Sequence, residues 1–240
     1  MCGRFTNRYS WRQLKDLYDL TTPFLTSNFP PRYNIAPTQN SFVVRLKNGR
    51  RELADIRWGL VPFWSKDTKG AGKMINAQSE TADVKPAFRN AWKTHRCLVV
   101  ADAFYEWPEK DKPRLITLKD DEPFAFAGLW ESWRPKEGDK LETFTILTTT
   151  PNEFMADVHD RMPVMLAPES WPTWLGETAG DLKALCRPFP SDRMTSWPVD
   201  RRVGNVKNDD AELVKPLSTI GETNAQFIPT LDLQNSTAKQ

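Results

Sequence analysis

Apolar residues follow two kinds of spacing along this chain. Between residues 10 and 20 they recur at helical intervals, with Ser10 placed as the N-cap, which predicts an amphipathic helix. Residues 41–47 and 52–59 instead carry strand-like patterns on either side of Asn48-Gly49, a dipeptide typical of a tight hairpin turn. We therefore predict a helix followed by a β-hairpin in the first part of the chain.

Short apolar segments separated by charged turns continue beyond the hairpin. Strands are expected over residues 96–107, 115–118, 124–133, 144–149 and 159–166. Short helices are expected to begin near Thr81 and to cover residues 151–158, 169–175 and 181–186. Because strands dominate and do not alternate regularly with helices, the pattern predicts one α+β domain, with a curled, largely antiparallel, barrel-like sheet and short peripheral helices. This domain is expected to span residues 1–220, and the polar residues 221–240 to form a loosely ordered tail.

Composition narrows the class of protein. The 240 residues carry a net charge of only +2, so no overall basic field requires a nucleic-acid partner, although a local basic face remains open. The three cysteines are widely spaced, which favours reduced thiols in a cytoplasmic protein over a disulfide framework. No apolar run of about 18 residues is present, so a membrane span is not expected. Neither zinc-ligand spacing nor a nucleotide-binding glycine motif occurs, and we expect no metal or cofactor.

Cys2 directly follows the initiator methionine, a position that gives a cysteine unusual chemistry. Removal of Met1 would expose an α-amine and a thiol on adjacent carbons, and both are nucleophiles near neutral pH. Such a 1,2-aminothiol condenses with an aldehyde: the amine forms a Schiff base, and the thiol then closes a thiazolidine ring. The ordinary alternative is that Cys2 is a small buried residue in a first strand.

Two polar residues stand where they could serve such chemistry. Glu106 ends the most apolar strand, between Tyr105 and Trp107, so burial is expected to disfavour its charged form and raise its pKa toward the range of a general acid. His159 lies at a predicted helix-to-strand junction, where catalytic groups are common. Ordinary roles remain open for both, because strand alternation can turn Glu106 outward and His159 can be a surface or capping residue.

Several other residues are candidates for binding. Asn76 precedes the helix predicted near Thr81, where it is either an N-cap or an amide that positions an amine or a carbonyl oxygen. Arg4 and Arg161 lie next to the candidate chemistry in sequence and are able to bind phosphates locally. Trp64 follows a proline in a predicted loop, where its ring either packs in the core or stacks on a base.

Eight short motifs occur in a fixed order from residue 1 to about residue 215. They are Met1-Cys2-Gly3-Arg4-Phe5, Arg32-Tyr33-Asn34-Ile35-Ala36-Pro37, Trp58-Gly59-Leu60-Val61-Pro62, Asn76-Ala77 with Glu80-Thr81, Lys85-Pro86 with Phe88, Phe104-Tyr105-Glu106-Trp107, His159-Asp160-Arg161-Met162-Pro163 and Val203-Gly204-Asn205-Val206-Lys207-Asn208. Each motif is weak by itself. Together they resemble the SOS response-associated peptidase (SRAP) family, whose members are abasic-site processing proteins.

The resemblance implies a protein that senses abasic sites in single-stranded DNA, often at a junction with duplex. Mature Cys2 would form a covalent thiazolidine crosslink with the ring-opened sugar and so shield the lesion during DNA repair. It further implies that Glu106 is the general acid and base, and that Asn76 and His159 orient and protonate the sugar and the Schiff base. Weak lyase activity and reversal of the crosslink are expected from the same Schiff base.

The resemblance also implies positions that contact DNA, namely Arg4, Trp64, Gln78 and Arg161. The family commonly has Asn-Ala-Arg where this chain has Asn76-Ala77-Gln78. A charged and potentially bidentate phosphate contact is thereby replaced by a neutral amide, so weaker binding of that phosphate is expected, with the crosslinking chemistry unaffected. We expect a monomer in the cytoplasm that associates with the nucleoid when it is bound to DNA.

Two other classes of function remain open at this level. A cysteine peptidase that acts at most on its own Met1 would use Cys2, His159 and Glu106 as nucleophile, base and orienting carboxylate. A non-catalytic reader of single-stranded DNA or of junctions would use Trp64 and the arginines but would not need a free α-amine. Crosslinking that depends on an aldehyde in the DNA distinguishes both from an abasic-site processing protein.

Overall fold

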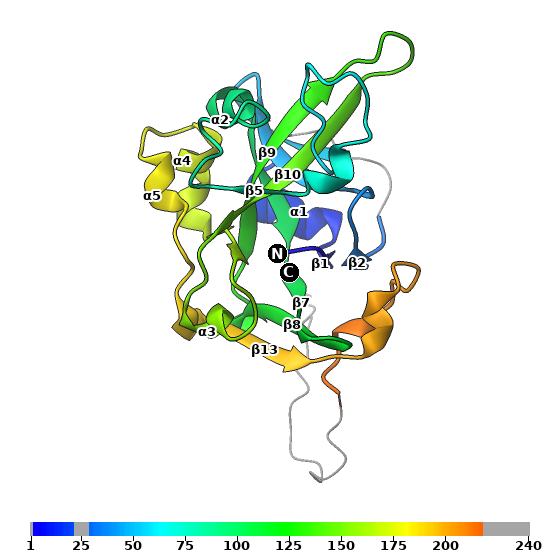
Figure 1. Cartoon of the computed structure of the whole chain (residues 1–240). Coiled ribbons are helices and arrows are strands. Elements are labelled where there is room, and N and C mark those ends of the chain that lie inside the picture. Colours follow the sequence, from blue (N-terminus) through cyan, green and yellow to red (C-terminus); the bar gives the residue numbers. More distant parts are fainter. Residues whose placement is uncertain (1, 22–28, 218–240) are drawn as a thin grey trace, which may run out of the picture.

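The structure, a computed structural model, describes residues 2–21 and 29–217 and contains two β-sheets (Figure 1). Strands of the first sheet pair in a ring and so close a barrel. The ring consists of β3 (Asn40–Lys47), β4 (Arg50–Trp58), β10 (Leu141–Thr149), β9 (Phe124–Trp133) and β6 (Arg96–Ala101). Every pair in the ring is antiparallel except β4–β10, which is parallel. The predicted single α+β domain with a curled, largely antiparallel sheet is confirmed.

The second sheet lies below the barrel in Figure 1. Its strand order is β13 (Met194–Pro198), β8 (Lys112–Leu118), β7 (Ala103–Glu109), β1 (Phe5–Asn7) and β2 (Arg32–Ile35), all antiparallel. Three short strands extend the barrel sheet: β5 (Asn76–Gln78) and β11 (Met162–Pro163) pair with β10, and β12 (Met165–Leu166) pairs with β9. One strand, β10, therefore holds two segments that are far apart in the sequence.

Helices are short throughout the described residues. They are α1 (Trp11–Tyr18), α2 (Arg89–Thr94), α3 (Glu153–Ala156), α4 (Trp171–Leu175) and α5 (Leu182–Leu185). Single 3₁₀ turns are η1 (Ala71–Lys73), η2 (Lys119–Asp121), η3 (Pro168–Ser170), η4 (Ser191–Arg193), η5 (Arg201–Gly204) and η6 (Ala211–Val214). None of the described helices is long and apolar enough to cross a membrane.

Local signals for the first helix and the hairpin are confirmed. Ser10 caps α1, because its hydroxyl accepts from the N–H of Gln13 while the Gln13 side chain accepts from the N–H of Ser10. Asn48 and Gly49 join β3 to β4 with φ values of 52° and 71°, the left-handed conformation that a two-residue hairpin turn needs.

The long strand predicted over residues 96–107 is wrong, because the chain forms two strands in two sheets there. Asp102 separates β6 from β7, and its N–H donates to the Thr6 carbonyl (3.1 Å). Its carboxylate accepts from the Thr6 hydroxyl (2.8 Å) and from the Arg8 N–H (3.1 Å). These contacts with the N-terminal segment turn the chain out of the barrel, and a continuous apolar run cannot reveal them.

Two further predictions need correction. The helix predicted near Thr81 begins only at Arg89, and residues 79–88 form successive turns, because the residue before Pro86 is disfavoured in helical conformation. The strand predicted over residues 159–166 is split into β11 and β12, which pair with different barrel strands. The predicted tail of residues 221–240 lies outside the described residues.

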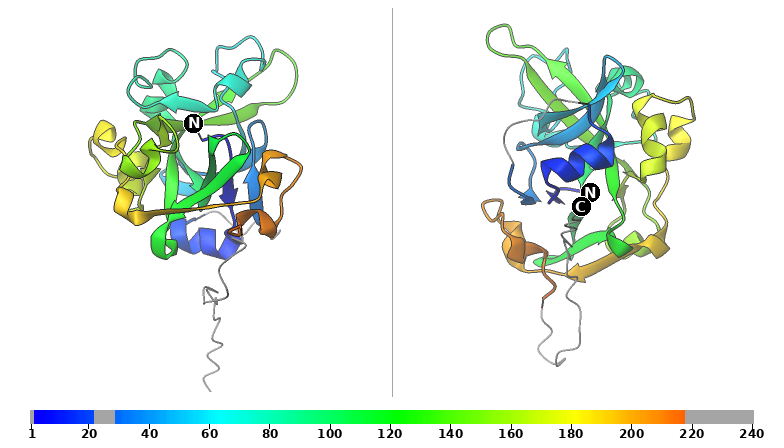
Figure 2. Two further views of the ribbon diagram at one scale, coloured as in Figure 1. Left: turned by 60° about the horizontal axis from the view of Figure 1, so that its bottom comes forward. Right: turned by 180° about the vertical axis from the view of Figure 1, so that it is seen from behind.

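Apolar side chains form two main clusters on the two faces of the barrel wall. Along β6, alternate side chains join one cluster or the other, as strand geometry dictates. The first of these clusters includes the buried faces of α1, α2 and α4, and Figure 2 shows α1 lying against the sheet from behind. The second includes Cys2 and Phe5 together with Phe104 of β7. The N-terminal segment is therefore part of the hydrophobic core.

Candidate functional site

Cys2 lies beside β7 because the N-terminal segment continues the line of β1. These two strands are antiparallel, and the N–H of Tyr105 donates to the Arg4 carbonyl (2.9 Å), so the segment runs on along β7 toward Glu106. Cys2 is fully buried, and its Sγ lies 3.9 Å from the Arg4 carbonyl. The ordinary alternative, a small buried residue, is therefore correct as a description of its surroundings, although it leaves the chemistry of Cys2 undecided.

Glu106 is buried with 4% of its surface exposed. Burial raises its pKa above the ordinary value, and the nearby His159 opposes this effect. Burial also raises the pKa of the Cys2 thiol, and the charge of Glu106 raises it further. The predicted desolvation of Glu106 is confirmed, and the outward orientation is wrong. Burial thus shifts both groups toward their neutral forms, and the two groups lie close enough to influence each other's charge.

Asn76 holds the N-terminal segment from the other side. It is the first residue of β5, opposite Ile146 of β10, and not the N-cap of a helix as one alternative had it. Its Nδ2 donates to the Cys2 carbonyl at 2.8 Å. Its Oδ1 is buried and has no hydrogen-bond partner within the described part of the chain. The amide thus fixes the position of residue 2 and keeps one acceptor available.

His159 lies between α3 and β11, so the predicted junction is confirmed. Its N–H donates to the Met155 carbonyl (2.8 Å), which seats the residue at the end of the helix. Nδ1 lies 3.0 Å from the Arg161 N–H and 2.6 Å from Asp160 Oδ1. A neutral Nδ1 accepts from the N–H, whereas a protonated Nδ1 donates to the carboxylate. Nδ1 therefore has a hydrogen-bond partner whether or not it carries a proton.

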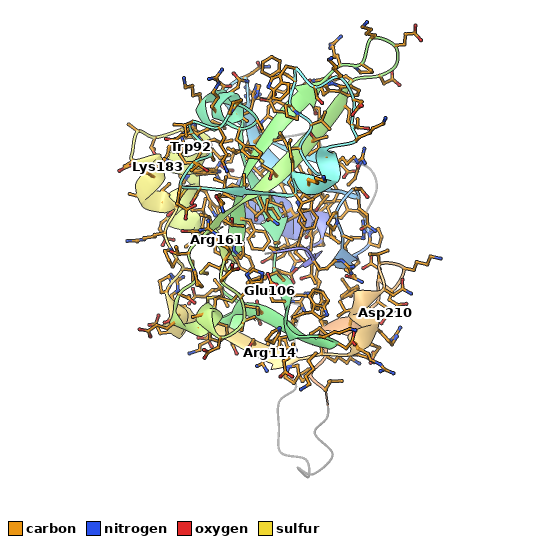
Figure 3. The ribbon with its side chains drawn as sticks, viewed as in Figure 1. Trp92, Glu106, Arg114, Arg161, Lys183 and Asp210 are labelled. Carbon is orange, nitrogen blue, oxygen red and sulfur yellow. The ribbon has the colours of Figure 1, made fainter. Side chains whose placement is uncertain are left out.

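Arg161 lies on the barrel side of the site and is engaged by protein groups. Nη1 and Nη2 donate to the two carboxylate oxygens of Glu80 at 2.9 and 2.8 Å, and Nη2 also donates to the Thr148 carbonyl (2.7 Å). In the view of Figure 3, the label of Arg161 lies just above that of Glu106. Sequence reasoning missed Glu80, although it stands in the same short motif as Asn76.

Arg4 is also held by protein groups, on the side of the second sheet. Its Nη1 donates to Asn34 Oδ1 (3.0 Å) and to the Val203 carbonyl (2.8 Å), and its Nη2 donates to the Gly204 carbonyl (3.2 Å). Burial lowers its pKa, in keeping with a guanidinium partly withdrawn from water. These contacts connect the N-terminal segment to the C-terminal one.

Trp64 is the exposed member of the ten tryptophans, all of which lie in the described residues. It and its neighbour Phe63 each have 55% of their surface exposed, so core packing of Trp64 is wrong. The loop that carries them is held by Trp133, whose Nε1 donates to the Ser65 carbonyl (2.8 Å). Gln78, the last residue of β5, is exposed as well. The loop that carries Phe63 and Trp64 therefore presents two exposed aromatic rings to solvent next to an anchored Ser65.

The described residues contain no disulfide and no evident metal site. Cys2, Cys97 and Cys186 are free thiols, all of them buried. Within residues 2–21 and 29–217, no group of three or more His, Cys, Asp or Glu side chains is placed to hold a metal ion.

Comparison with known proteins gives consistent results. Residues 1–206 match the model of the family described as SOS response associated peptidase (SRAP). The chain is 43% identical over 221 residues to Abasic site processing protein YoaM of Bacillus subtilis (strain 168), covering 89% of this chain and 97% of the relative. It is 31% identical over 234 residues to Abasic site processing protein YedK of Escherichia coli (strain K12), and the match covers 90% of this chain and 100% of that relative. A crystal structure of a protein from Bacteroides thetaiotaomicron superposes with a TM-score of 0.80 at 25% identity, covering 90% of this chain and 99% of that one.

Proposed function

Because the chain belongs to the SOS response associated peptidase (SRAP) family, we propose that it captures abasic sites in single-stranded DNA as a covalent thiazolidine through Cys2. The relatives named above are abasic site processing proteins, which supplies the class of substrate. The observation that carries the proposal is the enclosure of Cys2 by Asn76 and Glu106. An N-terminal residue placed in this way is positioned for chemistry at its own amine and thiol.

The proposed reaction starts after Met1 has been removed. The α-amine of Cys2 adds to the aldehyde carbon of the ring-opened deoxyribose and forms a carbinolamine. Loss of one water gives the Schiff base, and addition of the thiol to the same carbon closes the thiazolidine, with the thiol proton passing to the nitrogen. The net change is one aldehyde, one amine and one thiol converted to one thiazolidine and one water, so no cofactor is required.

Glu106 is the residue proposed to move protons in these steps. Burial raises its pKa and so favours the protonated carboxyl, whose proton is needed when the sugar opens and when the carbinolamine loses water. His159, which interacts with Glu106, is proposed to orient the sugar and assist the transfer. Asn76 is proposed to hold the Cys2 carbonyl and to offer its unpartnered Oδ1 to the α-amine or to a sugar hydroxyl.

A cysteine peptidase is less well supported by the same geometry. Such an enzyme needs a thiolate with a depressed pKa beside an imidazolium, whereas burial raises the pKa of Cys2. The contacts of Cys2 Sγ and of His159 Nδ1 go to the Arg4 carbonyl and to residues 160–161, respectively. The described contacts of Cys2 Sγ are thus to a backbone carbonyl and not to the imidazole that a cysteine peptidase requires as its base.

The proposed DNA face combines the residues assigned by resemblance. Trp64 has the exposure needed to stack on a base. Arg4 and Arg161 flank the site. Gln78 is exposed at the position where the family commonly has an arginine, so it would offer DNA a neutral amide instead of a charge. We propose that the protein acts as a monomer in the cytoplasm, on single strands and on their junctions with duplex. Weak lyase activity and slow reversal of the crosslink are proposed as further outcomes of the Schiff base.

Intact-mass measurement tests this proposal. The protein is incubated with a single-stranded oligonucleotide that carries one abasic site and, in parallel, with the same oligonucleotide carrying a tetrahydrofuran analogue that has no aldehyde. We expect a heat-stable species with the mass of the protein lacking Met1 plus the DNA minus one water, formed with the abasic strand alone.

Three altered proteins complete the test. Cys2→Ser is expected to lose the stable adduct, and a tag that blocks residue 2 is expected to prevent it, because only a free aminothiol closes the ring. Cys97→Ser removes another buried thiol and serves as the control that retains the adduct. A blocked protein that still forms the adduct would contradict the mechanism, and tight binding without any adduct would favour the non-catalytic reader of DNA.

A further inference from the structure

The ion pair of Arg161 with Glu80 occupies the part of the arginine that a phosphate would use. Both terminal nitrogens of Arg161 donate to the two oxygens of Glu80, the same two-pronged geometry that arginine makes with phosphate. The side chain of Arg161 is only 16% exposed, whereas that of Glu80 is 46% exposed. A phosphate that approaches from solvent therefore meets the carboxylate before it reaches the guanidinium.

The turn that carries Glu80 is held by a second cation, Lys183. Lys183 of α5 donates to the carbonyls of Ser79 (2.9 Å) and Glu80 (3.2 Å) and to Asp83 Oδ1 (2.7 Å). Its ammonium also lies 4.9 Å from the ring centre of Trp92. In the view of Figure 3, Lys183 and Trp92 are labelled above Arg161, and Glu106 is labelled below it. The backbone of the turn that carries Glu80 is thus held to α5, which keeps the Glu80 side chain within reach of Arg161.

Electrostatics make Glu80 a competitor for phosphate. Hydrogen bonds from Arg161 lower the pKa of Glu80, so the carboxylate is charged at neutral pH. A charged carboxylate neutralises the guanidinium and repels a second anion at the same edge. The contact of Arg161 with Thr148 does not depend on Glu80, so the guanidinium keeps an anchor if the carboxylate moves away.

We propose that Glu80 is a specificity-determining residue that competes with the DNA backbone for Arg161 and so weakens binding to undamaged strands. This inference rests on the proposed function, because it assumes that DNA passes Arg161. Non-covalent contacts are shared by damaged and undamaged DNA, whereas the covalent step at Cys2 requires an aldehyde. Weak non-covalent binding therefore increases the difference in retention between damaged and undamaged DNA. Undamaged strands dissociate, whereas an abasic strand is retained by the crosslink.

The test measures equilibrium binding of undamaged single-stranded oligonucleotide at several salt concentrations. Glu80→Gln keeps the size of the side chain and removes its charge. We expect it to bind about threefold to tenfold more tightly than the wild type at low salt, the range expected for freeing one partly exposed charged pair. We also expect the log–log salt slope to steepen by about 0.7, the value for one additional neutralised phosphate on a single strand.

Matched variants separate this effect from others. Glu137→Gln removes an exposed negative charge in the β9–β10 connection and is expected to bind as the wild type does. In the Arg161→Ala background, Glu80→Gln is expected to have no further effect on affinity or slope, because the group it frees is gone. Thermal melting of each variant checks that the fold is retained.

The outcomes distinguish this inference from the proposed function. A Glu80→Gln protein that binds undamaged DNA no more tightly than the wild type overturns the role of Glu80, as does tighter binding that persists in the Arg161→Ala background. Crosslinking of the wild type to abasic DNA is measured separately. If the wild type crosslinks but Glu80→Gln gives no tighter binding, only the present inference fails, whereas absence of crosslinking contradicts the proposed function itself.

Discussion

At the scale of single residues, the fold decides the chemistry of Glu106. Its carboxyl is buried on the face of β7 that meets Cys2, and burial raises its pKa. Replacement by Gln keeps the shape and removes the transferable proton. We expect Glu106→Gln to slow crosslink formation by about 10²–10⁴-fold, the usual effect of losing one general acid or base, with non-covalent binding of undamaged DNA unchanged. A time course of the adduct on denaturing gels measures the rate.

The same variant gives a pH test of that role. If the protonated form of Glu106 is the proton donor, the wild-type rate falls as pH rises through the raised pKa, and Glu106→Gln lacks this part of the profile. Glu109→Gln, an exposed carboxyl at the end of the same strand, is the matched control and is expected to follow the wild type. Full-speed crosslinking by Glu106→Gln would remove Glu106 from the mechanism.

At the scale of elements, Asp102 is the junction at which β6 leaves the barrel and β7 enters the second sheet. Its carboxylate accepts hydrogen bonds from Thr6 and Arg8, and it is 8% exposed. Hydrogen bonds to a charged group contribute about 1.5–3 kcal/mol each, so we expect Asp102→Ala to lower the free energy of unfolding by about 2–4 kcal/mol. Urea denaturation measures the change. The exposed Asp16→Ala on α1 is the control, with an expected change within about 0.5 kcal/mol.

At the scale of the whole molecule, the C-terminal segment is fastened across the second sheet to the N-terminal one. Asn34 of β2 is fully buried, and its Nδ2 lies within hydrogen-bond distance of the carbonyls of Val203 (3.1 Å), Asn205 (3.1 Å) and Asn208 (2.8 Å), while its Oδ1 accepts from Arg4. Figure 2 shows this segment in orange beside the blue β2 strand. One amide thus ties together three parts of the chain.

Removing that amide is expected to loosen the segment without unfolding the barrel. Asn34→Ala leaves buried polar groups without a partner, which costs about 1–3 kcal/mol. Hydrogen exchange followed by mass spectrometry is expected to show faster exchange in residues 203–210 while barrel peptides remain protected. Asn40→Ala, at an exposed asparagine, is the control. If residues 203–210 exchange as slowly in Asn34→Ala as in the wild type, the Asn34 amide is not what holds this segment in place.

Sequence by itself determined the features that depend on neighbouring residues. The capped helix after Ser10 and the turn at Asn48-Gly49 are specified by contacts within four residues, so their patterns predict them correctly. The apolar strand around Glu106 predicted its desolvation as one alternative, and the structure decided that the side chain is buried. The family motifs placed the candidate residues in order, and these assignments stay predictions until the variants are measured.

Tertiary structure decided the features that depend on distant pairing. The break at Asp102 exists because β1 pairs with β7, and Asn76 begins a strand because β10 pairs with β5. The contact of Arg161 with Glu80 joins positions 81 residues apart, and that of Arg4 with the Val203 carbonyl joins positions 199 apart. Local propensity carries no information about such partners, because loop closure and sheet register bring them together only in the folded chain.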